Sequence, residues 1–78
     1  MMSNKELIVD KENMYRLIED SSGKLFISVL CGGIAMYELK FELNSIELEG
    51  YQSQGKIYLE QLAQKVARQT GEYEDRAV

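Results

Sequence analysis

Apolar and polar residues alternate along the middle of the chain, a pattern typical of β-strands with one buried face. The clearest run covers residues 34–43. One set of alternate positions in this run is apolar throughout: Ala35, Tyr37, Leu39, Phe41 and Leu43. Similar runs cover residues 14–20 and 24–31. The sequence therefore predicts a three-stranded antiparallel meander over residues 14–20, 24–31 and 34–43.

Two glycine-containing turns set the register of this meander. Each fits a three-residue hairpin loop that ends in a residue with positive φ, a conformation in which glycine costs least. Gly23 and Gly33 would occupy those positions. The predicted opposite pairs include Asp20 with Lys24, Tyr15 with Val29, and Leu30 with Ile34.

A two-residue turn at Gly32 and Gly33 is the alternative for the second hairpin. It would set Ile27 against Glu38, so that apolar and charged side chains would share one face. The three-residue turn sets Ile27 against Tyr37 and makes one face apolar in both hairpins. Since a slip of one residue turns every side chain to the other face, the two registers differ clearly, and the three-residue turn is preferred.

The N-terminal segment is polar except for an apolar triplet at residues 7–9. A helix over residues 4–18 is one interpretation, because several apolar residues in that range would share a stripe. The hairpin register instead favours a strand that begins near Met14. We therefore expect residues 1–13 to form a loose N-terminal arm.

The C-terminal half has helical spacing. Apolar or small residues recur there in steps of three and four: Leu48, Tyr51, Gly55, Leu59, Leu62 and Val66. Asn44 and Glu47 have the spacing of a helix N-cap and its reciprocal partner. We predict one amphipathic helix over residues 45–69, packed on one sheet face. A break within residues 50–55 is the alternative, since each of its two glycines costs ~1 kcal/mol in a helix interior. Residues 71–78 are expected to form a solvated acidic tail.

The composition is that of a small acidic domain. The chain has 78 residues, of which 45% are apolar and 28% charged, and its net charge is −4. We therefore expect one α+β domain over residues 1–78. Lysine and arginine are not clustered, which disfavours nucleic-acid binding. The longest apolar stretch, residues 25–31, falls short of the about 20 residues that a membrane span needs. With no secretion signal and one cysteine, a cytoplasmic location is expected.

Little in the sequence indicates catalysis. The chain has no histidine, the commonest general base near neutral pH and a common metal ligand. Cys31 therefore cannot form a Cys–His pair, and we expect a structural thiol. Glu38 and Glu42 on the third strand and the acidic residues 72–75 are expected to be solvated. The sequence predicts no catalytic residue, no cofactor and no metal site.

The predicted register leaves one sheet face uncovered, because a single helix can cover only the other. The apolar side chains on this face are Met14, Ile18, Phe26, Leu30, Ile34 and Met36. Such a cluster exceeds the usual scatter of surface apolar residues and indicates a binding surface for a protein partner or a second copy. The alternative is that the N-terminal arm folds over this face through residues 7–9.

The sequence therefore predicts a small non-catalytic protein-interaction domain that binds a protein partner or itself through this sheet face. An inhibitor or antidote of a basic partner is one form that an acidic domain of this size could take. Two alternatives stay open. One is a homodimeric structural protein with no other binding activity. The other is a small-molecule-binding domain with a pocket between sheet and helix, lined by Tyr37, Tyr58 and Cys31.

Overall fold

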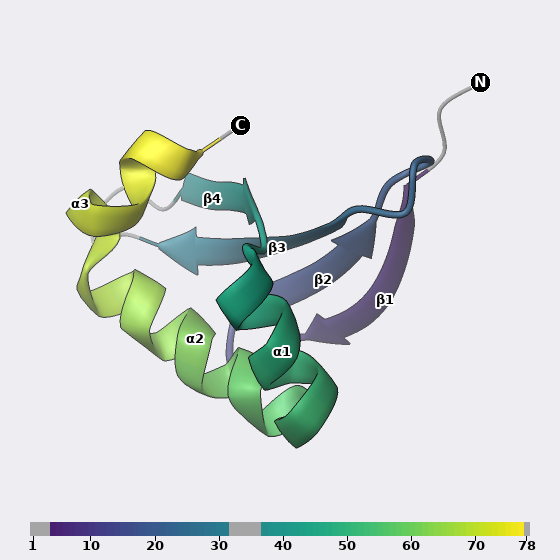
Figure 1. The fold of residues 1–78 in the computed structure, drawn as a ribbon. Coiled ribbons are helices and arrows are strands. Elements are labelled where there is room, and N and C mark those ends of the chain that lie inside the picture. Colours follow the sequence, from purple (N-terminus) through teal and green to yellow (C-terminus); the bar gives the residue numbers. More distant parts are fainter. Residues whose placement is uncertain (1–3, 32–36, 78) are drawn as a thin grey trace.

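An antiparallel four-stranded sheet carries its two main helices on one face (Figure 1). The computed structural model describes residues 4–31 and 37–77. The strands, which lie side by side in chain order, are β1 (Lys5–Asp10), β2 (Tyr15–Glu19), β3 (Leu25–Cys31) and β4 (Tyr37–Glu42). The helices are α1 (Ser45–Gln54), α2 (Lys56–Arg68) and α3 (Thr70–Tyr73), followed by a 3-10 turn, η1 (Glu74–Arg76). The predicted α+β class and the antiparallel sheet are confirmed.

The prediction of three strands is wrong, because the segment expected to be a loose arm contains β1. This strand pairs with β2, and a bulge interrupts the pairing between Glu6 and Ile8. Beyond the bulge, Ile8 packs against the core while Val9 lies on the opposite face. The apolar triplet at residues 7–9 thus adds an edge strand to the sheet and does not fold across its face.

The register of the first hairpin is confirmed. Tyr15 lies opposite Val29. The backbone N–H of Asp20 donates to the carbonyl of Lys24 at 3.0 Å, and Gly23 has the expected positive φ of 89°. The Asp20 carboxylate also accepts hydrogen bonds from backbone N–H groups of this turn, which fixes its geometry.

The predicted register of the second hairpin is wrong by four residues. The observed pairs include Ile27 with Phe41 and Leu30 with Glu38, where the prediction had Tyr37 and Ile34. Because side chains alternate with a period of two, an even shift leaves the predicted core face unchanged. It nevertheless moves Phe41 to the centre of the core and leaves Tyr37 43% exposed near the end of the sheet. The glycine pair of this hairpin lies outside the described residues.

The single long helix is also wrong, and the alternative of a break is confirmed. α1 ends at Gln54, and Gly55 follows with a φ of 70°, which glycine adopts without strain. The chain turns there, so that α1 and α2 lie side by side over the sheet (Figure 1). The two helices approach each other closely at Gly50, where an added Cβ would lie within 2.7 Å of three ring carbons of Tyr58.

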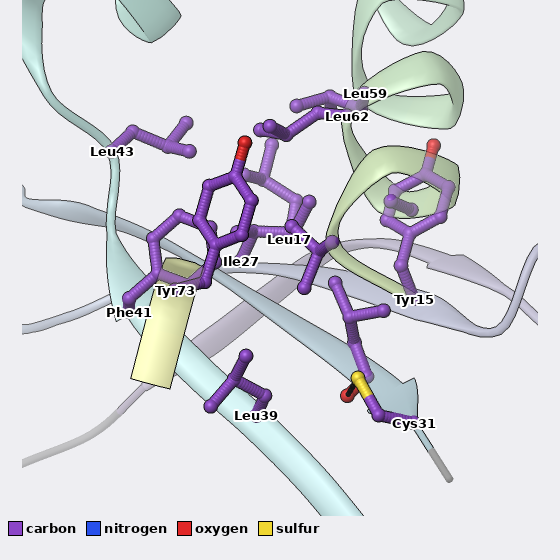
Figure 2. Packing of buried hydrophobic residues seen from close by; sticks show 13 residues of the cluster. Tyr15, Leu17, Ile27, Cys31, Leu39, Phe41, Leu43, Leu59, Leu62 and Tyr73 are labelled. Atoms are coloured by element: carbon purple, nitrogen blue, oxygen red, sulfur yellow. Dashed lines mark hydrogen bonds between the residues drawn. The ribbon is translucent and has the colours of Figure 1, made fainter. Parts of the chain in front are cut away.

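The hydrophobic core lies between the sheet and α2. Its strand residues come from the predicted core face, and the helix contributes one apolar stripe. The most deeply buried members are Tyr15, Leu17, Ile27, Val29, Cys31, Phe41, Leu59, Ala63 and Val66. Figure 2 shows the strand and helix side chains meeting in this layer. The alternating apolar residues of the strands and the apolar stripe of α2 thus form one cluster, with the strands on one side and the helix on the other.

The C-terminal residues do not form a solvated tail as predicted. Tyr73 of α3 is buried, and its ring stacks on that of Phe41 with centroids 5.3 Å apart (Figure 2). The guanidinium of Arg76 lies beside both rings, 4.4 Å from the Phe41 centroid and 5.9 Å from the Tyr73 centroid. α3 and η1 therefore close one end of the core.

A carboxylate at the start of α1 holds this C-terminal segment in place. Glu47 and Asn44 form the predicted capping box, with hydrogen bonds of 2.8 and 2.9 Å. Both oxygens of Glu47 also accept from Arg76, at 2.7 and 2.9 Å, and Arg76 donates to the carbonyl of Glu42. Burial alone would raise the pKa of Glu47, but the hydrogen bonds from Arg76 and the Asn44 N–H outweigh it and lower that pKa.

The contact between Gly50 and Tyr58 predicts that Gly50→Ala destabilises the protein. In a helix with free space, this change stabilises by about 1 kcal/mol. Here the new methyl group collides with the Tyr58 ring, and such overpacking costs about 1–3 kcal/mol. Urea unfolding measures the difference. Gly71→Ala is the matched control, because nothing lies within 4 Å of a Cβ at Gly71. Equal effects at both glycines would contradict the contact.

The Glu47–Arg76 pair predicts a loss of stability in acid. The folded-state pKa of Glu47 is lowered from 4.5, so its contribution is complete above about pH 4.5 and is lost as the pH falls through the folded value. Glu47→Gln should reduce this part of the acid dependence of the melting temperature.

At neutral pH, Arg76→Met should lower the free energy of unfolding by about 2 kcal/mol, since it leaves a buried carboxylate short of hydrogen-bond donors.

Arg68→Met is the control for this pair, because Arg68 is exposed on the last turn of α2. It should change the unfolding free energy by less than about 1 kcal/mol. An Arg76→Met protein as stable as the Arg68→Met protein would show that the chain end is not held by this ion pair.

Candidate functional site

One face of the sheet points away from α1 and α2, and we call it the open face (Figure 1). Its side chains come from alternate positions of β2, β3 and β4. From β1 it receives Glu6, which precedes the bulge, and Val9, which follows the bulge. The members are Glu6, Val9, Arg16, Ile18, Phe26, Ser28, Leu30, Glu38, Lys40 and Glu42. Both main helices pack on the opposite side of the sheet.

Arg16 occupies the centre of the open face. Its guanidinium bridges two strands, because Nη1 donates to Glu6 at 2.6 Å and Nη2 donates to Glu38. Ser28 lies opposite Arg16 on β3 and is 1% exposed, with its hydroxyl near the Glu38 carboxylate but not at hydrogen-bond geometry. The Ser28 hydroxyl and Arg16 together lower the pKa of Glu38 against the effect of burial. These half-exposed ion pairs add little stability but fix the positions of the charges.

The end of the open face near the first hairpin turn is covered by its own side chains. The Lys40 ammonium lies 5.3 Å from the centroid of the Phe26 ring, a cation–π distance. Phe26 is therefore half-buried, and its cross-strand neighbour Ile18 is only 6% exposed. Apolar surface at this end is largely removed from solvent.

The other end of the open face holds exposed apolar side chains around a groove. Val9, Met14 and Leu30 come from β1, the β1–β2 turn and β3, and they are 51%, 48% and 39% exposed. They line a groove of about 320 Å³, which Ser28 and Arg16 also line. The groove thus has apolar walls with polar groups beside them, which is the usual character of a binding site.

The turn that carries Met14 is held by Asp10. The side chain and backbone N–H of Asn13 donate to this carboxylate at 2.9 and 3.0 Å, and Lys56 lies 3.3 Å away, which lowers the pKa of Asp10 to about 2. Met14 has a φ of 58°, a left-handed conformation that costs a residue with a side chain about 1–2 kcal/mol. Its carbonyl accepts the Leu30 N–H at 2.8 Å, which joins the backbones of these two groove residues.

The structure brings together two of the six residues predicted for partner binding. Met14 and Leu30 share the groove, whereas Ile18 is buried and Phe26 lies under Lys40. The remaining two, Ile34 and Met36, lie outside the described residues. Sequence reasoning missed Val9, because it did not assign the N-terminal triplet to a strand. The signal available was the pair Ile8 and Val9, since β-branched residues are enriched in strands.

Of the three residues expected to line a small-molecule pocket, Cys31 and Tyr37 lie opposite each other on β3 and β4, whereas Tyr58 lines a groove that neither of them lines. Cys31 is buried in the core, where its Sγ lies 3.6 Å from the Val29 carbonyl, and burial raises the pKa of its thiol. Tyr37 is exposed on β4. Tyr58 lines a different groove, of about 310 Å³, beside α1 and α2. A raised thiol pKa and full burial agree with a structural role for Cys31.

Within residues 4–31 and 37–77, no group of three or more acidic or cysteine side chains could hold a metal ion. None of the helices in this part of the chain is long and apolar enough to cross a membrane. Comparison of the chain with protein-family models, with curated proteins and with solved structures finds no match.

Proposed function

We propose that this chain is a non-catalytic protein-interaction domain that binds a protein partner or itself through the open face of its sheet. One observation carries the proposal: three exposed apolar side chains from three different elements, Val9, Met14 and Leu30, surround a groove on this face. Exposed apolar groups gathered at one place are typical of interaction sites, whereas single exposed apolar residues are ordinary.

The charges of the open face support binding at this end of the sheet. Arg16 is paired with two carboxylates, and Lys40 lies over an aromatic ring. Each of these groups already has a partner within the chain. The apolar groove is the part whose burial gains most from a partner. The net charge of −4 favours a basic partner for this domain.

The conformation of Met14 also supports a role for its side chain. Glycine would fit the left-handed φ of this turn without cost, yet the chain has methionine there. Local strain of this kind is found disproportionately at functional sites. Methionine is also flexible and polarisable, which suits it to contacts with a protein surface.

The prediction is that Met14→Gly weakens binding without weakening the fold. The substitution removes one wall of the groove and relieves the left-handed strain, so the unfolding free energy should stay the same or rise by up to about 1 kcal/mol. Leu30→Glu should abolish binding by placing a charge in the groove. Ile57→Glu is the matched control, because Ile57 is 61% exposed on α2, on the helix side of the sheet.

Wild type and the three variants are each immobilised as bait, and the proteins that they retain from extracts of the source cells are compared. The mass of each protein in solution is measured as well, to detect self-association. Retention of one protein by wild type and Ile57→Glu, but not by Met14→Gly or Leu30→Glu, supports the groove. Equal retention by all four baits contradicts it. A wild-type chain that retains nothing and stays monomeric at every concentration would overturn the interaction function.

A further inference from the structure

Within residues 4–31 and 37–77, no strand pairs with the outer edge of β4. Leu43 donates its N–H to Leu25 of β3, so alternate residues of β4, including Leu39, bond inward. The N–H and carbonyl groups of Glu38 and Lys40 therefore point outward from the sheet. An outward row of such groups is a template for another strand. The opposite edge is less suited to this, because the bulge in β1 interrupts its regular geometry.

The side chains beside this edge alternate in charge. Glu38 and Lys40 lie on the open face with Leu39 between them on the core face. Suppose that a second copy of β4 runs antiparallel along this edge, with a two-fold axis at Leu39. Each Glu38 then lies opposite Lys40 of the other copy, and the two Leu39 side chains face each other. Opposite charges in directly opposed positions stabilise paired strands.

The neighbouring symmetric registers lack this complementarity. A shift that centres the axis on Lys40 sets the two lysines against each other and Glu38 against Glu42. A shift that centres it on Glu38 sets the two glutamates against each other. Like charges in directly opposed positions are destabilising. Among these three registers, the one centred on Leu39 alone pairs opposite charges.

The C-terminal segment limits the length of this pairing. Arg76 donates to the outward carbonyl of Glu42, so the backbone ladder is confined to residues 38–40. Glu38 and Lys40 are already held on the open face, by Arg16 and by the ring of Phe26. Their side chains are therefore ordered before a second strand arrives, which lowers the entropic cost of pairing.

We propose that two copies of this chain associate through their β4 edges, in the register that sets Glu38 opposite Lys40. The result is one continuous sheet made of two four-stranded halves, with both helix layers on one side. Both open faces lie on the other side and stay accessible. This self-association does not require an occupied groove, although Glu38 also lines the groove, and it makes the protein bivalent for a groove partner.

Charge exchange at the edge tests the proposal. Glu38→Lys and Lys40→Glu should each weaken dimerisation roughly tenfold or more, because each substitution converts both attractive pairs into repulsive ones. An equimolar mixture of the two variants should form a heterodimer, since their charges are complementary again. Sedimentation velocity from about 10 μM to about 1 mM covers the weak range expected for a small interface.

Glu49→Lys is the control for net charge, because Glu49 is exposed on α1 and its substitution should leave dimerisation unchanged. Far-UV circular dichroism establishes that each variant is folded. For wild type, hydrogen exchange at the Lys40 amide should slow with concentration, since only pairing at this edge protects that outward N–H. A wild-type monomer at about 1 mM, or single variants that dimerise as well as wild type, would overturn the proposal.

Discussion

The Glu47 carboxylate joins the start of α1 to the C-terminal segment of the fold. It caps α1 through Asn44 and accepts two hydrogen bonds from Arg76, which lies 29 residues further along the chain. Arg76 in turn covers the ring of Phe41 and bonds the end of β4 at Glu42. A 78-residue chain buries a small core, so contacts that close one end of it contribute to a narrow margin of stability. One carboxylate thus links a helix start, a strand end and the chain terminus.

The two faces of the sheet are covered in different ways. The helix face is closed by α2 and by the Tyr73–Phe41 stack, and its side chains are apolar. None of the helices in the described part of the chain lies on the open face, where charged residues pair across the strands around Arg16 and apolar groups are exposed at one end. This asymmetry explains why an interaction site on the sheet is expected on one face and at one end of it.

The strand faces were predictable, whereas the exact pairing was not. Tyr15 lies opposite Val29 as the turn at Gly23 indicated, because that short loop leaves a single register. β4 pairs four residues away from its predicted place, yet Leu39 and Phe41 still point to the core. An even shift preserves the faces, so alternation gave no means of detecting it. The groove was predictable only in part. Met14 and Leu30 were assigned to its face, but Val9 lies there because β1 pairs with β2, and that pairing was not predicted.

The sequence alone determined the features that depend on neighbouring residues. Alternation assigned strand positions to two faces, and the spacing of Asn44 and Glu47 placed the start of α1. Only the tertiary structure decided the fourth strand, the break at Gly55, the docking of the C-terminal segment and the position of the groove. Each of these depends on contacts between residues distant in the chain. Local patterns specify which side of a strand or helix is apolar, but not which distant surface will cover it.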